Sequence, residues 1–160
     1  RKQRVSFTRE DKALPLPVQK SWVSILPYVN DLNDLNQYTL MIRGLDDYEY
    51  DIRIDDQLVA TRSAMQLALG TNLGNLTEGP IHAQGQEVLD AIDKKNELLH
   101  RRFRDVVMFN VPAWLADIGN ERKQKELEKR WAEITERQAK IYELAQPKPR
   151  KWVIEAKVPK

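Results

Sequence analysis

Hydrophobic and polar residues alternate over residues 38–62, and this alternation predicts a small β-sheet. Three short segments share the two-residue period: 38–43, 48–54 and 58–61. Turn residues separate them, Gly44-Leu45-Asp46-Asp47 after the first and Asp55-Asp56 after the second. Because this pattern is typical of hairpins, we expect an antiparallel three-strand sheet. Its second strand should bury the four residues that share one face, Tyr48, Tyr50, Ile52 and Ile54.

From residue 81 onward the apolar spacing changes to three and four residues, which is typical of helices. We expect one long helix from about Ile81 to Phe109 and a second from about Asn120 to Leu144. They should pair as an antiparallel helical hairpin over residues 81–145. The predicted seam consists of Val88, Ile92, Leu99, Phe103 and Val106 on the first helix and Leu127, Trp131, Ile134, Gln138, Ile141 and Ala145 on the second. If Trp131 is buried in this seam, Trp131→Ala should destabilise the chain by about 3–5 kcal/mol.

The remaining segments complete an α+β fold class. Residues 1–17 form an extended lead-in, because prolines exclude a helix there, and residues 18–29 a short helix that Pro27 interrupts. Ser63 is expected to cap a short helix over 64–69 that ends at Gly70. A C-terminal tail over 147–158 has the alternation of a final strand. The expected domain organisation is therefore the lead-in followed by one α+β domain over residues 18–160.

Composition narrows the class of protein only modestly. The chain has 160 residues, 41% of them hydrophobic, and 26 basic against 24 acidic residues, a net charge of +2. The mean hydropathy is −0.62. So small a charge excess gives no argument for nucleic acid or a membrane surface as partner, and we predict no membrane span. The absence of cysteine excludes disulfides and thiolate metal ligands.

The residues that hydrolysis requires are not arranged for it. A Ser-His-Asp hydrolase needs a base within reach of an activated serine. The two histidines, His82 and His100, both fall on the first long helix, where solvent-facing polar residues are the better interpretation. The serines lie outside any Gly-x-Ser-x-Gly setting; they are Ser6, Ser21, Ser24 and Ser63. We therefore predict no catalytic residues in this chain.

Other candidate sites also have simpler interpretations. Asp46-Asp47 and Asp55-Asp56 lie at separate turns, whereas a calcium cage needs several oxygen ligands that converge from one loop. Gly70-Thr71-Asn72-Leu73 is interpreted as a structural turn rather than an oxyanion hole. The basic residues near Arg101 and Lys148 are interspersed with acidic ones, as on a solvated face. We accordingly predict no cofactor-binding residues and no metal ligands.

Several motifs together resemble the C-terminal region of SGNH/GDSL-type esterase-like hydrolases. The similar segments are Val5-Ser6-Phe7, Ala13–Pro17, Tyr38–Leu45, Tyr48–Asp56, Leu58–Thr61, Gly70–Leu73, Asn96–Arg104 and Val111–Trp114. In that family a small hairpin follows the catalytic histidine and precedes two long helices. The resemblance implies that the catalytic Ser, Gly, Asn and Asp-x-x-His blocks lie N-terminal to Arg1, on polypeptide not included in this sequence. A signal peptide on such a precursor would place the protein outside the cytoplasm; the sequence itself leaves the compartment open.

Two functions follow as hypotheses. The first is a non-catalytic C-terminal segment of an esterase-like hydrolase that covers or shapes the hydrolase domain. The second is a stand-alone protein-interaction module that uses its helical hairpin. Expected partners are the hydrolase domain of the same precursor or another protein chain, with a homo-oligomer as a further possibility. Large apolar side chains in the lead-in and the inter-helix loop are the predicted interface residues: Phe7, Leu14, Leu16 and Trp114.

Overall fold

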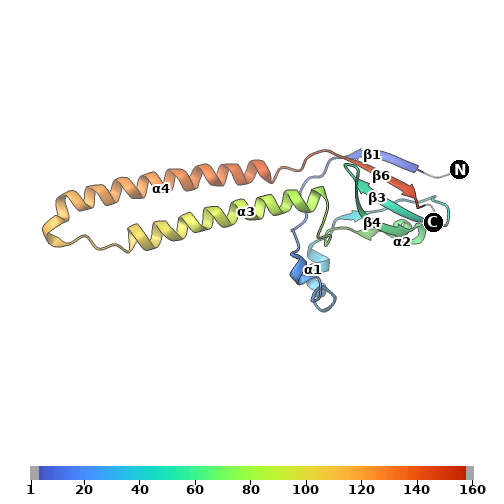
Figure 1. The fold of residues 1–160 in the computed structure, drawn as a ribbon, viewed down its shortest axis with the longest axis horizontal. Helices are drawn as coiled ribbons and strands as arrows, with labels where there is room; N and C mark the ends of the chain where they lie inside the picture. Colours follow the sequence, from blue (N-terminus) through green and yellow to red (C-terminus); the bar gives the residue numbers. More distant parts are fainter. Residues whose placement is uncertain (1–3, 158–160) are drawn as a thin grey trace. The chain divides into compact units, whose positions relative to one another are not determined.

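The computed structural model describes residues 4–157, apart from the side chains of Asn30 and Asn33. The chain divides into two compact units. The first contains the residues up to Gln86 together with those from Ala145 onward, and the second contains Glu87–Leu144. The first unit has mixed strands and short helices, whereas the second is helical, so the α+β class is confirmed (Figure 1).

A four-stranded antiparallel sheet forms the centre of the first unit, with strand order β1-β6-β3-β4. Its strands are β1 (Arg4–Arg9), β3 (Glu49–Ile54), β4 (Gln57–Ser63) and β6 (Arg150–Ala156). The β3–β4 hairpin is the predicted one, and its turn places Asp55 and Asp56 at φ +48° and +66°. Asp tolerates this left-handed region better than most residues. The β6 strand inserts between β1 and β3, with Phe7 opposite Trp152 and Ile52 opposite Ile154.

The sheet differs from the expected one at both of its ends. The first predicted strand contributes only β2 (Thr39–Leu40), which pairs with β5 (Thr71–Asn72) in a separate two-stranded sheet. The lead-in and the C-terminal tail supply β1 and β6 instead, although residues 1–3 and 158 of these predictions lie outside the described residues. Hydrogen bonds between the two ends of a chain leave no local signal in the sequence. The lead-in that was expected to be extended thus contributes a strand, β1, to the main sheet.

The core lies on one face of the sheet and is built around Trp152. Trp152, Tyr50, Ile52, Ile54 and Ile154 are almost completely buried. Tyr48 does not share this burial: it lies just before β3 and is exposed. The α2 helix (Ala64–Leu69) covers the core with Leu67, and Ser63 caps it as predicted. The Ser63 hydroxyl accepts from the Gln66 backbone N–H while the Gln66 side chain accepts from the Ser63 N–H, and Gly70 follows with φ +98°.

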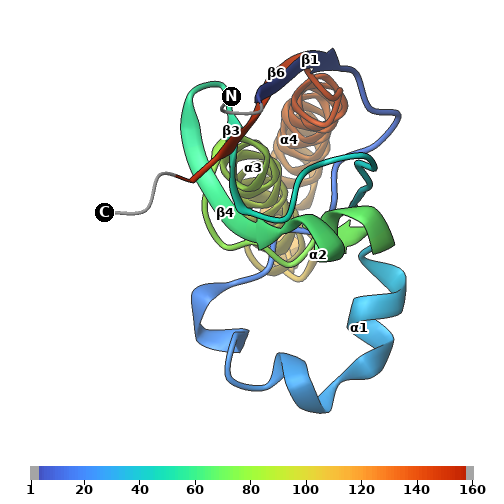
Figure 2. The ribbon, with the colours of Figure 1, turned by 90° about the vertical axis from the view of Figure 1, so that its right-hand side faces the viewer.

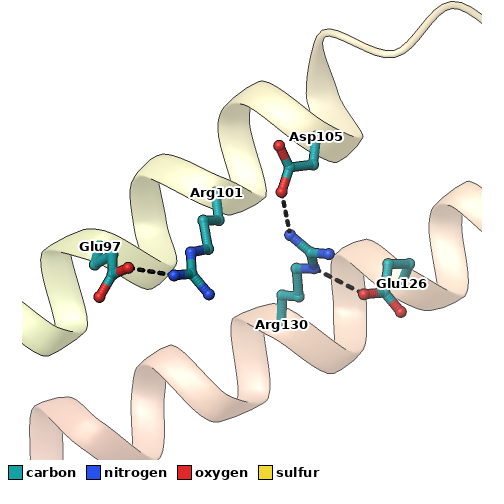
Figure 3. Close-up of polar contacts among 5 residues, drawn as sticks. All are labelled: Glu97, Arg101, Asp105, Glu126 and Arg130. Atoms are coloured by element: carbon teal, nitrogen blue, oxygen red, sulfur yellow. Dashed lines mark hydrogen bonds and ion pairs between the residues drawn. The ribbon is translucent and has the colours of Figure 1, made fainter.

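The second unit contains the antiparallel helical hairpin (Figure 1). The α3 helix (Pro80–Arg101) begins in the first unit and continues as a π-helical turn, η3 (Arg102–Val107). A short turn, η4 (Ala113–Leu115), leads into α4 (Ala116–Leu144). Lys95 donates to Gln138 across the hairpin. Figure 3 shows a second contact between the two sides of the hairpin, in which Arg130 Nη1 lies 3.5 Å from Asp105 Oδ2. Arg130 Nε also lies 2.7 Å from Glu126 Oε1 on its own helix.

The predicted seam is only partly closed. Val106, Ile134 and Ile141 are buried, but Leu99, Phe103 and Trp131 are 42%, 52% and 54% exposed. Two paired helices have only one shared face, and a π-helical turn rotates the residues that follow it off the regular seam. The Arg102 guanidinium lies 5.3 Å from the centre of the Trp131 ring. The burial of Trp131 expected from its spacing was therefore wrong.

Candidate interaction surface

The lead-in is fixed to the first unit by the side chain of Asn36. Its Oδ1 accepts from the Leu16 backbone N–H at 2.8 Å, and its Nδ2 donates to the Leu16 carbonyl at 3.0 Å. The same Nδ2 lies 2.7 Å from the Gly74 carbonyl. Asn36 is 4% exposed. Because a buried amide side chain must satisfy its hydrogen bonds, Asn36 holds the backbone at Leu16 and at Gly74 in fixed positions.

The motif at residues 70–73 has a structural role in this arrangement. Asn72 Oδ1 accepts from the backbone N–H groups of Tyr38 and Gly74, each at 2.9 Å. Gly74 approaches the chain so closely that an added Cβ would lie 2.0 Å from the Asn36 carbonyl oxygen. Only glycine fits such an approach. The Asn72 side chain thus serves the backbone, as expected for a structural turn.

A stacked cluster joins the lead-in to the core. The Arg9 guanidinium lies over the ring of Tyr38 at 4.4 Å and near that of Trp152 at 5.4 Å. The Tyr38 hydroxyl donates to Asp11, which also accepts from Arg9 Nε at 2.7 Å. Burial and then the hydrogen bond to Asp11 raise the pKa of Tyr38. The phenol therefore stays protonated and serves as a donor.

Between the fixed lead-in and Tyr38 lies an apolar arm, defined here as residues 19–35. It contains η1 (Lys20–Trp22), η2 (Leu26–Tyr28) and α1 (Asn30–Leu35). Figure 2 shows the arm projecting away from the four-stranded sheet. Six large apolar side chains on it are at least two-fifths exposed: Trp22, Val23, Ile25, Tyr28, Val29 and Leu35. Tyr28 and Leu35 reach 86% and 84%.

A groove of about 310 Å³ separates the arm from the lead-in. It is lined mainly by apolar residues, among them Leu14, Leu16, Leu32, Leu35 and Tyr38. Exposed apolar patches of this kind mark interaction surfaces in soluble domains. A second hollow beneath the lead-in, next to His82, has a volume of only about 10 Å³, room for a single water molecule. The surface therefore suits a protein segment better than a small substrate.

The predicted interface residues have different environments. Phe7 stacks on Trp152 with ring centres 6.1 Å apart, and both Phe7 and Leu14 pack against the core of this same chain. These two residues therefore make apolar contacts within the chain, Phe7 because β1 pairs with β6. Leu16 is 54% and Trp114 is 83% exposed. The short helix predicted over residues 18–29 is instead two 3-10 turns, η1 and η2. The apolar spacing there gave no sign that these side chains would stay exposed.

The polar candidates remain apart from one another. His82 Nε2 lies 3.0 Å from the Val18 carbonyl oxygen, and His100 is exposed on α3. Ser63 caps α2, and the serines at 6, 21 and 24 are exposed. Within residues 4–157, no cluster of His, Asp and Glu has the arrangement of a metal site.

Asp55 is part of a polar network rather than a candidate ligand. Its carboxylate accepts from Arg150 Nη1 at 2.7 Å and from the Lys151 backbone N–H at 3.0 Å. Burial alone would raise the pKa of Asp55, but these hydrogen bonds and the neighbouring cations outweigh it and lower the pKa. The network ties the β3–β4 turn to the start of β6. Arg150 also donates to Gln84 at 3.0 Å.

Comparison with known proteins supports the fold only. No protein-family model and no curated protein matches the chain. Among solved structures it is similar to a gut microbial diltiazem-metabolizing enzyme, with a TM-score of 0.70 and 23% identity. The match covers 97% of this chain and 43% of that enzyme. The chain therefore spans less than half of that enzyme's length. None of the helices within the described residues is long and apolar enough to cross a membrane.

Proposed function

We propose that this chain is a non-catalytic C-terminal segment of an SGNH/GDSL esterase-like hydrolase, in which it covers or shapes the hydrolase domain. The observation that carries the proposal is the apolar arm. A self-contained domain rarely leaves six large apolar side chains exposed on one 17-residue segment. Fixed at both ends by Asn36 and Asn72, the arm presents these side chains in a defined position.

The structural neighbour is consistent with this role. That enzyme is more than twice as long as the part this chain matches, so a comparable fold occurs there next to further polypeptide. The motifs at residues 38–73 supply the link to the esterase-like family. On this proposal, hydrolysis belongs to a domain that this chain contacts, and the chain contributes packing surface and cleft shape.

The test is a binding measurement between this chain and the hydrolase domain encoded upstream in its precursor. Calorimetry should detect a complex with the 160-residue chain, and Tyr28→Ser with Leu35→Ser should weaken it by about 1–3 kcal/mol. Leu69→Ser, at a residue 76% exposed on α2, is the matched control. A precursor that encodes no serine-hydrolase blocks upstream, or a complex insensitive to the arm variants, would refute the proposal.

The alternative function is a stand-alone interaction module that uses its helical hairpin. The specific observation in its favour is the exposure of Trp114, Phe109 and Met108 at the end of the hairpin. The two functions differ in the residues whose substitution should weaken binding. Substitutions in the arm should weaken binding to the hydrolase domain, and substitutions at the end of the hairpin should weaken binding of a partner protein to the stand-alone module.

A further inference from the structure

Exposed apolar side chains concentrate in one half of the hairpin. We call residues 99–131 the distal half, and residues 87–98 with 132–144 the basal half. Nine large apolar side chains of the distal half are more than one-third exposed: Leu99, Phe103, Val107, Met108, Phe109, Trp114, Leu115, Ile118 and Trp131. Of the described residues in the basal half, only Tyr142 is comparably exposed among the large apolar ones.

The exposed area is large enough for a stable contact. The four aromatic residues of this set are 52%, 55%, 83% and 54% exposed. With ~200 Å² for a whole aromatic side chain, they alone present about 500 Å². A standard interface buries about 800 Å² on each partner, and five aliphatic side chains remain to be added.

Charge divides along the same line. The distal half carries eight basic and five acidic side chains, a net charge of +3, whereas the basal half carries four basic and seven acidic, a net charge of −3. Several charges of each sign form no ion pair with another described residue: Arg104, Arg122 and Lys129 in the distal half and Glu87, Asp93 and Glu136 in the basal half. The hairpin is thus electrostatically complementary to an antiparallel copy of itself.

The extent of the apolar region favours a helical partner over a lipid surface. Leu99 lies eight residues before Val107, a distance of about 12 Å along a helix, and Trp131 is about 20 Å from Ile118. Insertion into a membrane interface would cover only about 5–10 Å of the tip. Leu99, Phe103 and Trp131 would remain exposed in that arrangement, whereas a helix pair lying alongside reaches them.

We propose that a second copy of this chain packs antiparallel along the distal half of the hairpin, about a twofold axis near Phe103 and Trp131. Each copy then covers the incompletely closed seam of the other, and four helices share one core. The cationic tip of each copy lies over the acidic basal half of its partner, so both charge contacts occur twice. This inference concerns the second unit and is independent of the proposed contact between the arm and a hydrolase domain.

Sedimentation equilibrium of the full chain tests the association. We expect a dimer that Phe103→Ser and Trp114→Ser weaken by at least about tenfold each in dissociation constant, and that high salt weakens further. Leu69→Ser is again the control, because it removes an apolar side chain that is also more than half exposed, but from the first unit. Circular dichroism confirms that each variant stays helical. A strict monomer at millimolar concentration overturns the proposal, and so does a dimer that both hairpin variants leave intact.

Charge reversal tests the antiparallel arrangement. Arg122→Glu and Glu136→Arg should each weaken the dimer, because each brings like charges together. An equimolar mixture of the two variants should associate more tightly than either variant alone, and a mixture that does not would show that the two halves do not face each other. The double variant carrying both changes should recover affinity, since the two positions meet across the interface. A double variant weaker than both single variants contradicts the arrangement.

The chain has no cysteine, so introduced cysteines report geometry directly. Asn120 and Tyr142 lie 11 residues on either side of Trp131 in α4, about 16 Å along the helix, and both are exposed. Mixing Asn120→Cys with Tyr142→Cys under oxidation should therefore yield the mixed disulfide in preference to the Asn120→Cys homodimer. Predominant 120–120 cross-linking indicates that the distal halves meet each other and overturns the antiparallel pairing. Association of the chain with phosphatidylserine vesicles that Trp114→Ser abolishes, in the absence of a dimer, would assign the tip to lipid instead.

Discussion

At the scale of single residues, Asn36 has the largest predicted effect on the first unit. It is buried and bonds the Leu16 backbone in both directions. Asn36→Ala should destabilise the chain by about 1–3 kcal/mol, because buried backbone groups lose their partners. Urea unfolding followed by circular dichroism measures the change. Asn110→Ala, at an exposed loop position, is the control, and equal effects of the two substitutions would show that the Asn36 bonds add no stability.

The Asp55 carboxylate should make stability depend on pH. Its pKa is lowered in the folded chain relative to its ordinary value. The ionised form is therefore favoured by folding, so the stabilisation is present above the unfolded pKa of about 3.9 and is lost as pH falls through the folded pKa. Asp55→Asn keeps a residue that tolerates positive φ and should flatten this acid limb of the unfolding curve. Asp47→Asn, at an exposed turn, should leave that limb unchanged.

At the scale of elements, the hairpin seam depends on few residues. Ile134 is 6% exposed, whereas Trp131 is 54% exposed. Ile134→Ala should cost about 2–5 kcal/mol through the cavity it leaves. Trp131→Ala should cost about 1 kcal/mol in dilute solution, where only partial burial and the contact with Arg102 are lost. Thermal unfolding at low protein concentration compares the two, and a larger loss for Trp131 would place its indole in the seam after all.

At the scale of the whole molecule, we expect the isolated chain to hydrolyse no short acyl ester above background. Transition-state stabilisation needs a positioned nucleophile and oxyanion donors, and Ser63 and Asn72 are engaged with the backbone. Release of nitrophenol from a nitrophenyl acetate measures this activity. Turnover that disappears in Ser63→Ala or His100→Ala would contradict the prediction.

The sequence by itself determined the elements whose signals are local. The alternation over 48–61 predicted the β3–β4 hairpin, Ser63 and Gly70 predicted both ends of α2, and the three-four spacing predicted the two long helices. Each of these patterns reflects side chains a few residues apart, so their periodicity is readable without a partner. The α+β class followed from their order.

Only the tertiary structure decided which segments meet. Pairing of β1 with β6 brings Phe7 opposite Trp152, although almost the whole chain separates them. Three hydrogen bonds of the Asn36 and Asn72 side chains likewise join residues more than 30 positions apart. Burial was decided in the same way. Trp131 and Ile134 fit the same helical spacing, yet a two-helix seam with a π-helical turn encloses one and exposes the other. Spacing fixes the face of a helix on which a residue lies, whereas the number of neighbours that cover this face is a property of the folded chain.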